Sequence, residues 1–370
     1  MFIEIHILQN FAPSNLNRDD TGNPKDSDFG GVRRARISSQ CIKRAIRSHP
    51  SFTMATQVEN AVRTRWMTRL IIESLIRAGK NQEEADAMAV ALATQYCKMD
   101  KGHTSVLLYL SSSEINAAVE TLLANWTEIK AGLKDGKSQE LEILTKGLFK
   151  TLKDRTGAPD IALFGRMLAE KPELNIDAAC QVAHALSTHR VSMEMDFYTA
   201  VDELSTEEET GAGMMGMVGF NSACFYRYAR IDWEQLVKNL GGDKDLAKKT
   251  VKGFLLAAAK AVPTGKQNSF AAQNPPDFLL GVARFDGGAW SLANAFETPV
   301  KPAKDGGVVC PSIIALDAYW GKLVKTYGND GVKPVSLAVA CGGNLVNLKS
   351  ALSENLNTWV DCLLNELPKE

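Results

Sequence analysis

The sequence predicts an α+β protein in which a sheet domain is interrupted by a long helical insertion. Residues 2 to 8 alternate apolar and polar side chains, as a strand does. Residues 54 to 187 follow helical spacing, with breaks at glycines. Strand patterns return at residues 222 to 231 and 277 to 285. Together these observations indicate one sheet domain built from both ends of the chain, which is an α+β arrangement.

The first strand places Ile3, Ile5 and Ile7 on one side and polar residues on the other, so we expect one buried face. Residues 11 to 36 are rich in Asn, Asp, Gly and Pro and predict a long polar loop. Loops of this length are usually functional or disordered. A short helix should follow at about residues 38 to 48.

The insertion shows no strand-like alternation, and we therefore predict that it is entirely helical. After it, residues 245 to 263 form a further helical pattern that ends at Pro263. Residues 202 to 219 are first acidic and then rich in Gly and Met, which predicts a hairpin or loop.

The composition is that of a soluble globular protein: of 370 residues, 45% are apolar and 23% are charged. The length fits about two domains. No apolar run reaches the ~18 residues needed to span a bilayer, and the first residues do not resemble a signal peptide. Seven widely spaced cysteines argue against a disulfide framework or a zinc knuckle. We expect small core cysteines in a reducing cytoplasm.

Charge is unevenly distributed along the chain, although the net charge is only −1. Residues 29 to 58 contain no acid and six Lys or Arg residues, whereas residues 191 to 226 contain no base and seven acids. A near-neutral average argues against a generally basic nucleic-acid protein. Two segments of opposite sign nevertheless predict two different surfaces.

The run FGGVRRARISSQCIKRAIR, residues 29 to 47, carries the functional argument. Ser38 or Ser39 can cap a helix in which four long polar side chains form one stripe, because they are spaced i, i+3, i+4 and i+7: Gln40, Lys43, Arg44 and Arg47. The opposite face would pack on the sheet. Gly30 and Gly31 would let a polyanion approach the backbone. Five further cations feed the same region: Arg18, Lys25, Arg33, Arg34 and Arg36.

A charged helix face is often only a solvated surface. Here the stripe has no acids, follows a cap and a glycine pair, and has three arginines upstream. A phosphate-binding role is then as well supported as the solvated face.

The acidic segment, residues 191 to 221, also contains many Met and aromatic side chains. Charge cannot attract it to phosphate, but it could contact bases by stacking or wedging. The simpler alternative is a flexible hairpin whose apolar residues pack on a neighbouring domain or subunit.

Several motifs in order along the chain resemble the CasC family, the crRNA-binding backbone subunits of the type I-E CRISPR Cascade complex. The resemblance covers SNLNRDDTGNPKDSDFGGVRRARISSQCIKRAIR (14 to 47), IALFGRM (161 to 167), AHALSTHRVSMEMDFYTAVDE (183 to 203), FNSACFYRYARI (220 to 231), AVPTGKQNSFAAQNP (261 to 275) and SLANAFE (291 to 297).

The resemblance implies an RRM-like (ferredoxin-like) palm at residues 1–50 and 222–370. Helical fingers would occupy residues 51–189, and a thumb hairpin residues 190–221. Copies would stack into a filament along the crRNA, and each thumb would displace a nucleotide at regular intervals. The remaining bases would pair with target DNA in antiviral defence. The implied partners are crRNA, the target DNA strand, neighbouring copies and other Cascade subunits. No cofactor, metal, membrane or enzymatic activity is expected.

The resemblance also carries over individual RNA-binding residues. On the palm these are Arg18, Lys25, Ser38, Gln40, Lys43, Arg44 and Arg47. Arg166 and Met167 match the finger motif near the displaced nucleotide, and Phe197 and Tyr198 match the thumb aromatics. Arg34, Arg36 and Lys266 complete the predicted set. The Met-rich run at residues 213 to 219 departs from the family pattern, which leaves the wedge residue open.

Two other classes of function remain as alternatives. An enzyme, such as a ribonuclease or nucleotide enzyme, could use His6, His184 or His189. However, the G-x-G-x-x-G at residues 211 to 216 and the G-K-S at residues 136 to 138 lack the flanking pattern of a nucleotide site. A protein-only scaffold could instead use the acidic thumb as a docking strand.

Overall fold

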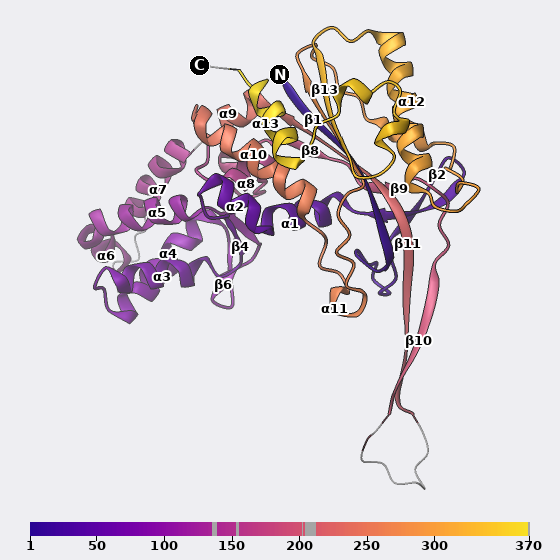
Figure 1. Ribbon diagram of the computed structural model, residues 1–370. Coiled ribbons are helices and arrows are strands. Elements are labelled where there is room, and N and C mark those ends of the chain that lie inside the picture. Colours follow the sequence, from indigo (N-terminus) through magenta and orange to yellow (C-terminus); the bar gives the residue numbers. More distant parts are fainter. Residues whose placement is uncertain (135–138, 153–154, 202, 204–211, 369–370) are drawn as a thin grey trace. The chain divides into compact units, whose positions relative to one another are not determined.

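The computed structural model describes residues 1–134, 139–152, 155–201, 203 and 212–368 (Figure 1). It divides into two compact units. The first, which we call the sheet unit, comprises Met1–Phe52, Val182–Arg230 and Lys252–Glu370. The second, the helical unit, comprises Thr53–Gln181 and Ile231–Val251. Residues 231–251, expected in the palm, therefore cluster with the helical unit. The predicted α+β class is confirmed.

The sheet unit is built on one antiparallel sheet with the strand order β13-β12-β1-β11-β9-β3-β2, and β8 and β10 also pair with β11. Its strands are β1 (Phe2–Ser14), β2 (Asp26–Phe29), β3 (Val32–Ile37), β8 (Cys180–Val182), β9 (Ala185–Ser187), β10 (Glu194–Val201), β11 (Ala212–Asp232), β12 (Phe278–Arg284) and β13 (Val332–Ala338).

Helices cover both faces of this sheet. They are α1 (Ser39–Ser48), α10 (Lys244–Lys260), α11 (Gln267–Phe270), α12 (Val309–Tyr327) and α13 (Leu356–Asn365). Within the sheet, β12, β1, β11 and β9 are neighbours in that order. Short 3₁₀ turns complete the chain: η1 (Pro172–Leu174), η2 (Leu292–Phe296), η3 (Gly342–Asn344) and η4 (Lys349–Ala351).

The first strand is buried on both faces, so the expectation of a single buried face was wrong. Ile5 and Ile7 contact the side of the sheet covered by α1, whereas Leu8 packs in the core formed with α12. Even Glu4 and His6 are fully buried. The local alternation was read correctly, but the second helical layer comes from residues more than 300 positions away.

The predicted long loop at residues 11 to 36 is largely strand, because β1 continues to Ser14 and β2 and β3 form a hairpin. The hairpin turn is Gly30-Gly31, with φ of 60° and 73°, as a type I′ turn requires. A Cβ on Gly30 would collide with the carbonyl of Glu297. Gly30 therefore turns tightly against the protein, whereas a Cβ on Gly31 would meet nothing within 4 Å. The role of the pair in admitting a polyanion stays a prediction.

The helical unit has its own hydrophobic core. Its helices are α2 (Pro50–Thr56), α3 (Met67–Arg77), α4 (Gln82–Tyr96), α5 (Ser112–Ala124), α6 (Trp126–Lys134), α7 (Gln139–Leu152), α8 (Pro159–Phe164) and α9 (Trp233–Asn239). Ile71, Leu92 and Leu122 are among the side chains that interlock α3, α4 and α5. Asn81 caps α4, and Ser111 with Glu114 forms a capping box on α5.

The prediction that the insertion is entirely helical was wrong. β4 (Val62–Thr64) pairs with β7 (Leu108–Leu110), and β5 (Met99–Asp100) pairs with β6 (His103–Thr104). Strands of two or three residues are too short to produce a visible alternation in the sequence.

The cysteines are buried or half-buried. One pair differs from the prediction that the cysteines are unpaired core residues. Cys97, Cys180 and Cys224 are free and buried, whereas Cys310 and Cys341 form a disulfide in the sheet unit. In the described part of the chain, no helix is long and apolar enough to cross a membrane.

Candidate nucleic-acid interface

Helix α1 forms as its sequence indicates. Ser38 is the N-cap, and its Oγ accepts a hydrogen bond from the Cys41 amide at 3.3 Å. Ile42 and Ile46 are buried, which turns the opposite side of the helix outward. Gln40 and Arg44 are exposed, while Lys43 and Arg47 are half-buried. The first turn contains no acid, so the helix N-terminus keeps its partial positive charge.

A groove of about 740 Å³ runs beside this helix, within the size range of ligand sites. It brings together four predicted site residues: Arg18, Ser38, Gln40 and Arg44. The other wall is the segment Val262–Gly265. A Cβ on Gly265 would collide with the carbonyl of Leu16, so this wall can close on residue 16 only with glycine there. Apart from the family resemblance of residues 261 to 275, no local pattern in the sequence predicts that this segment lines a groove.

The turn that carries Arg18 is ordered by its own polar groups. The Asp19 carboxylate accepts hydrogen bonds from the amides of Thr21 and Asn23, both at 2.9 Å. Hydrogen bonding from Thr21 lowers the pKa of Asp19, which keeps a negative charge at this edge of the groove. Asn15 donates to the carbonyl of Gly219 at 2.8 Å and so ties the turn to the base of the β10–β11 hairpin.

Lys25 and Arg36 lie together in a small recess beside this turn. Arg36 donates to the carbonyl of Asp26 at 3.1 Å and lies 3.1 Å from Nδ1 of His184. Burial, followed by the charges of Arg36 and Lys25, lowers the pKa of His184. A neutral His184 can accept from Arg36, which leaves the local charge positive.

Arg34 is placed differently from the prediction. Its guanidinium is buried and donates to the carbonyls of Ser187 at 3.1 Å and Phe296 at 2.8 Å, and burial lowers its pKa. This arrangement gives Arg34 a structural role and does not support its predicted direct contact with RNA. Arg33 pairs with Asp26 at 2.8 Å within the β2–β3 hairpin.

Lys266 directly follows the groove wall. It is half-buried, has a φ of 48° and precedes α11. Gln267 donates to the carbonyl of Pro263 at 2.8 Å, which holds this part of the chain against the wall. The structure thus places Lys266 beside the groove but not in its lining.

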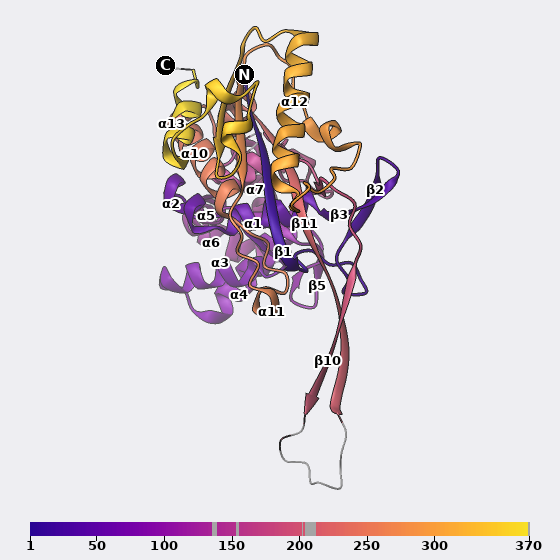
Figure 2. The same cartoon turned by 45° about the vertical axis from the view of Figure 1, so that its right-hand side comes forward.

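The hairpin β10–β11 extends beyond the rest of the sheet, as Figures 1 and 2 show. Phe197 lies opposite Met217, and Tyr198 lies opposite Gly216. Opposite residues of an antiparallel pair share a face, so Phe197 and Tyr198 point to different sides. The Phe197 face is apolar and exposed: Met195, Phe197, Met215 and Met217. Of the acidic run, residues 202 and 204–209 lie outside the described residues.

The Tyr198 ring lies directly over Gly216, so close that a Cβ added to Gly216 would collide with it. The same face also carries Glu194 and Asp196. Phe197, by contrast, is 61% exposed. Tyr198 is 41% exposed, so of the two predicted thumb aromatics Phe197 is the more accessible to a ligand.

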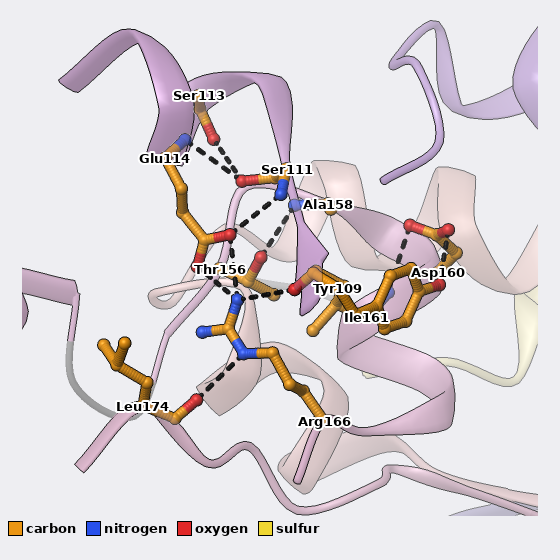
Figure 3. Close-up of polar contacts among 10 residues, drawn as sticks. All are labelled: Tyr109, Ser111, Ser113, Glu114, Thr156, Ala158, Asp160, Ile161, Arg166 and Leu174. Atoms are coloured by element: carbon orange, nitrogen blue, oxygen red, sulfur yellow. Dashed lines mark hydrogen bonds and ion pairs between the residues drawn. The ribbon is translucent and has the colours of Figure 1, made fainter. Parts of the chain in front are cut away.

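In the helical unit Arg166 is buried, whereas Met167 is exposed. Figure 3 shows the partners of Arg166. The Arg166 side chain is 1% exposed and donates to both Glu114 carboxylate oxygens, at 2.7 and 2.9 Å. It also donates to the carbonyls of Tyr109 and Leu174. Met167, next in sequence, is 86% exposed. This burial does not support the predicted direct contact of Arg166 with RNA, but it leaves Met167 available.

The predicted enzyme residues do not form a common site. His6 is buried, lies 2.9 Å from the Tyr226 hydroxyl, and has a pKa lowered by burial to about 3. His189 accepts from the Cys224 amide through Nε2 at 3.3 Å. Within the described ranges, no cluster of His, Cys, Asp and Glu could hold a metal. Residues 212 to 216 of the G-x-G-x-x-G lie in strand β11, and residues 136–138 fall outside the described residues.

The family model for CT1975-like proteins matches residues 3–361. The chain belongs to the CT1975-like family. The resemblance to CasC proteins is confirmed by this match and by two solved structures.

Two solved structures contain chains that resemble this protein in three-dimensional structure. One comes from a structure described as "CRISPR RNA-guided surveillance complex, pre-nicking", with 31% identity and a TM-score of 0.86. The other comes from a "CRISPR RNA-guided surveillance complex", with 27% identity and a TM-score of 0.63. Each comparison covers 99% of both chains. No curated protein sequence matched.

Proposed function

We propose that this chain is the crRNA-binding backbone subunit of a type I-E CRISPR Cascade surveillance complex. The observation that carries the proposal is the groove beside α1, which is lined by Arg18, by Arg44 and by the N-terminus of α1, with no acid in its first turn. Long cations and free amides at a helix start bind phosphate without reading bases. The two similar chains belong to RNA-guided surveillance complexes.

The division of labour follows from the chemistry of these surfaces. The α1 groove holds the phosphates of the guide, as an RRM-like palm would. The exposed rings and thioethers at Phe197, Met217 and Met167 contact bases and displace a nucleotide. The remaining bases stay open for pairing with target DNA, so that sequence is read by base pairing and not by the protein.

The complex would contain several copies of this chain and other Cascade subunits, and would act in antiviral defence in the cytoplasm. A head-to-tail contact between copies does not close on itself and therefore produces a filament. We further propose that the chain has no enzymatic activity of its own.

The double variant Lys43→Ala, Arg44→Ala tests the phosphate-binding role. Removing two cations should weaken RNA binding about tenfold at 0.15 M salt and reduce the slope of log affinity against log salt by roughly 1.4. Different RNA sequences should lose affinity equally. Fluorescence anisotropy with several labelled RNAs, each titrated at four or more salt concentrations, measures both quantities.

The matched control is Lys322→Ala, Lys325→Ala, which removes the same charge from exposed positions of α12, on the other face of the sheet. It should bind RNA like the wild type. Loss of affinity for only one base identity in the α1 variant would contradict phosphate binding. A complex purified without any short RNA would favour the protein-only scaffold.

A further inference from the structure

A second surface in the helical unit combines cations with an exposed aromatic ring. Residues 60 to 72 contain three arginines and one tryptophan but no acid. The fold distributes this run over β4 and the start of α3. Neither the α1 groove nor the hairpin uses any of these residues. We call the set Arg63, Trp66, Arg69, Lys101 and His103 the Trp66 surface.

The β5–β6 hairpin is fixed against this run. The carbonyl of Arg65 accepts from the Thr104 amide at 2.9 Å, and Arg65 Nε donates to the carbonyl of Thr104 at 2.8 Å. Arg65 also pairs with Asp100 at 3.3 Å. Arg65 therefore acts as a structural clamp whose charge is balanced. The clamp holds the β5–β6 hairpin, whose turn carries Lys101 and whose His103 ring contacts Trp66.

The indole of Trp66 contacts two neighbouring side chains and is still exposed. The Arg69 guanidinium lies 3.9 Å from the indole centroid, and the His103 ring meets it edge-on at 5.0 Å. The residue is nevertheless 42% exposed. Arg63 lies over the Tyr109 ring at 4.5 Å. Within the described residues, neither Arg63 nor Arg69 forms an ion pair.

The chemistry of the Trp66 surface indicates which class of ligand it can bind. A planar ring backed by a guanidinium offers a stacking platform with positive charge. Arg63 on β4 and Lys101 in the β5–β6 turn add positive charge, and Asp100, next to Lys101, is already paired with Arg65. An acidic peptide would satisfy the cations but not the platform. An unpaired base between two phosphates satisfies both.

We propose that the Trp66 surface is a second nucleic-acid contact of this chain, made of different residues from the guide-binding groove. It takes a single-stranded segment by stacking one base on Trp66, while Arg63, Arg69 and Lys101 neutralise the flanking phosphates. Stacking and charge neutralisation are shared by RNA and DNA, so the chemistry defines the ligand as an unpaired strand of either kind.

The test is a titration of the purified full-length protein, in the complex it forms, with labelled single-stranded oligonucleotides that do not pair with the guide. One arm uses DNA and the other RNA of the same sequence. Trp66→Ala should weaken binding about 5- to 150-fold in at least one arm, without changing the salt slope, because stacking releases no counterions. Arg63→Ala should reduce that slope by roughly 0.7. Trp66→Phe should retain part of the affinity.

Arg77→Ala is the matched control, since it removes an exposed arginine of the same helix that contacts only Glu73 and Ser74. It should bind like the wild type. The proposal is overturned if Trp66→Ala binds both oligonucleotides normally, or if it loses a protein subunit of the complex instead. Loss of the bound guide would also overturn it, because Trp66 would then belong to the guide site. Since the readout is added oligonucleotide, it stays distinguishable from a failure of the α1 groove.

Discussion

Arg34 and Arg166 lie inside the protein, whereas Arg18 and Arg44 lie on its surface. All four were predicted to contact RNA from their positions in family motifs. The buried pair donate hydrogen bonds to carbonyls or to Glu114, while the exposed pair line the groove. A guanidinium can bind phosphate only if it is not already committed to partners in the core.

Arg166→Ala should destabilise the helical unit by about 3–5 kcal/mol, because it leaves the Glu114 charge buried without its partner. The Glu114 side chain is 3% exposed, so water does not replace the lost contact. Chemical denaturation followed by circular dichroism measures the change.

The double variant Glu114→Leu, Arg166→Met provides the control, since removing both charges costs much less than removing one. It should recover most of the lost stability. If Arg166→Ala unfolds at the same denaturant concentration as the wild type, the buried pair does not stabilise the helical unit.

At the level of elements, the hairpin β10–β11 places two adjacent aromatic residues on opposite faces. Phe197 belongs to the open apolar face, while Tyr198 lies over Gly216 on the face that carries Glu194 and Asp196. A single base cannot stack on both rings at once. The two residues, equivalent in the sequence, are therefore expected to differ in function.

Phe197→Ala should abolish the regular pattern of displaced guide nucleotides, because the lost ring removes ~1–3 kcal/mol of stacking. Tyr198→Ala should leave that pattern in place. Chemical probing of base reactivity along the guide in the purified complex reads the pattern directly. The reverse result, with the pattern lost only in Tyr198→Ala, would place the ligand on the other face.

Elements whose signals are local could be predicted from the sequence. The cap at Ser38 and the outward stripe of α1 depend on residues within one or two turns. The strand at residues 222 to 231, in turn, follows from alternation. The groove wall at Gly265, the second buried face of β1 and the partners of Arg34 and Arg166 could not be predicted. Apart from Leu174, the partners named above lie 52 to 262 residues away, and no periodicity specifies such distant contacts.

At the scale of the whole molecule, the proposed non-closing contact between copies would make the length of the assembly depend on the RNA. Complexes assembled on guides of increasing length should therefore grow in steps of one subunit, 40.3 kDa. Mass photometry resolves such steps. A mass that stays constant for every guide length would indicate a closed oligomer, and the filament would have to be abandoned.

The projecting hairpin also bears on how the protein must be made in the cell. In the described part of the chain, β10 pairs only with β11, so its outer edge offers unpaired backbone groups beside exposed methionines. Such edges recruit other strands and promote aggregation. Glu194 and Asp196 sit on this strand as gatekeepers, because two copies pairing edge to edge would bring like charges together. Solubility before assembly thus depends on the same acidic residues that cannot attract RNA.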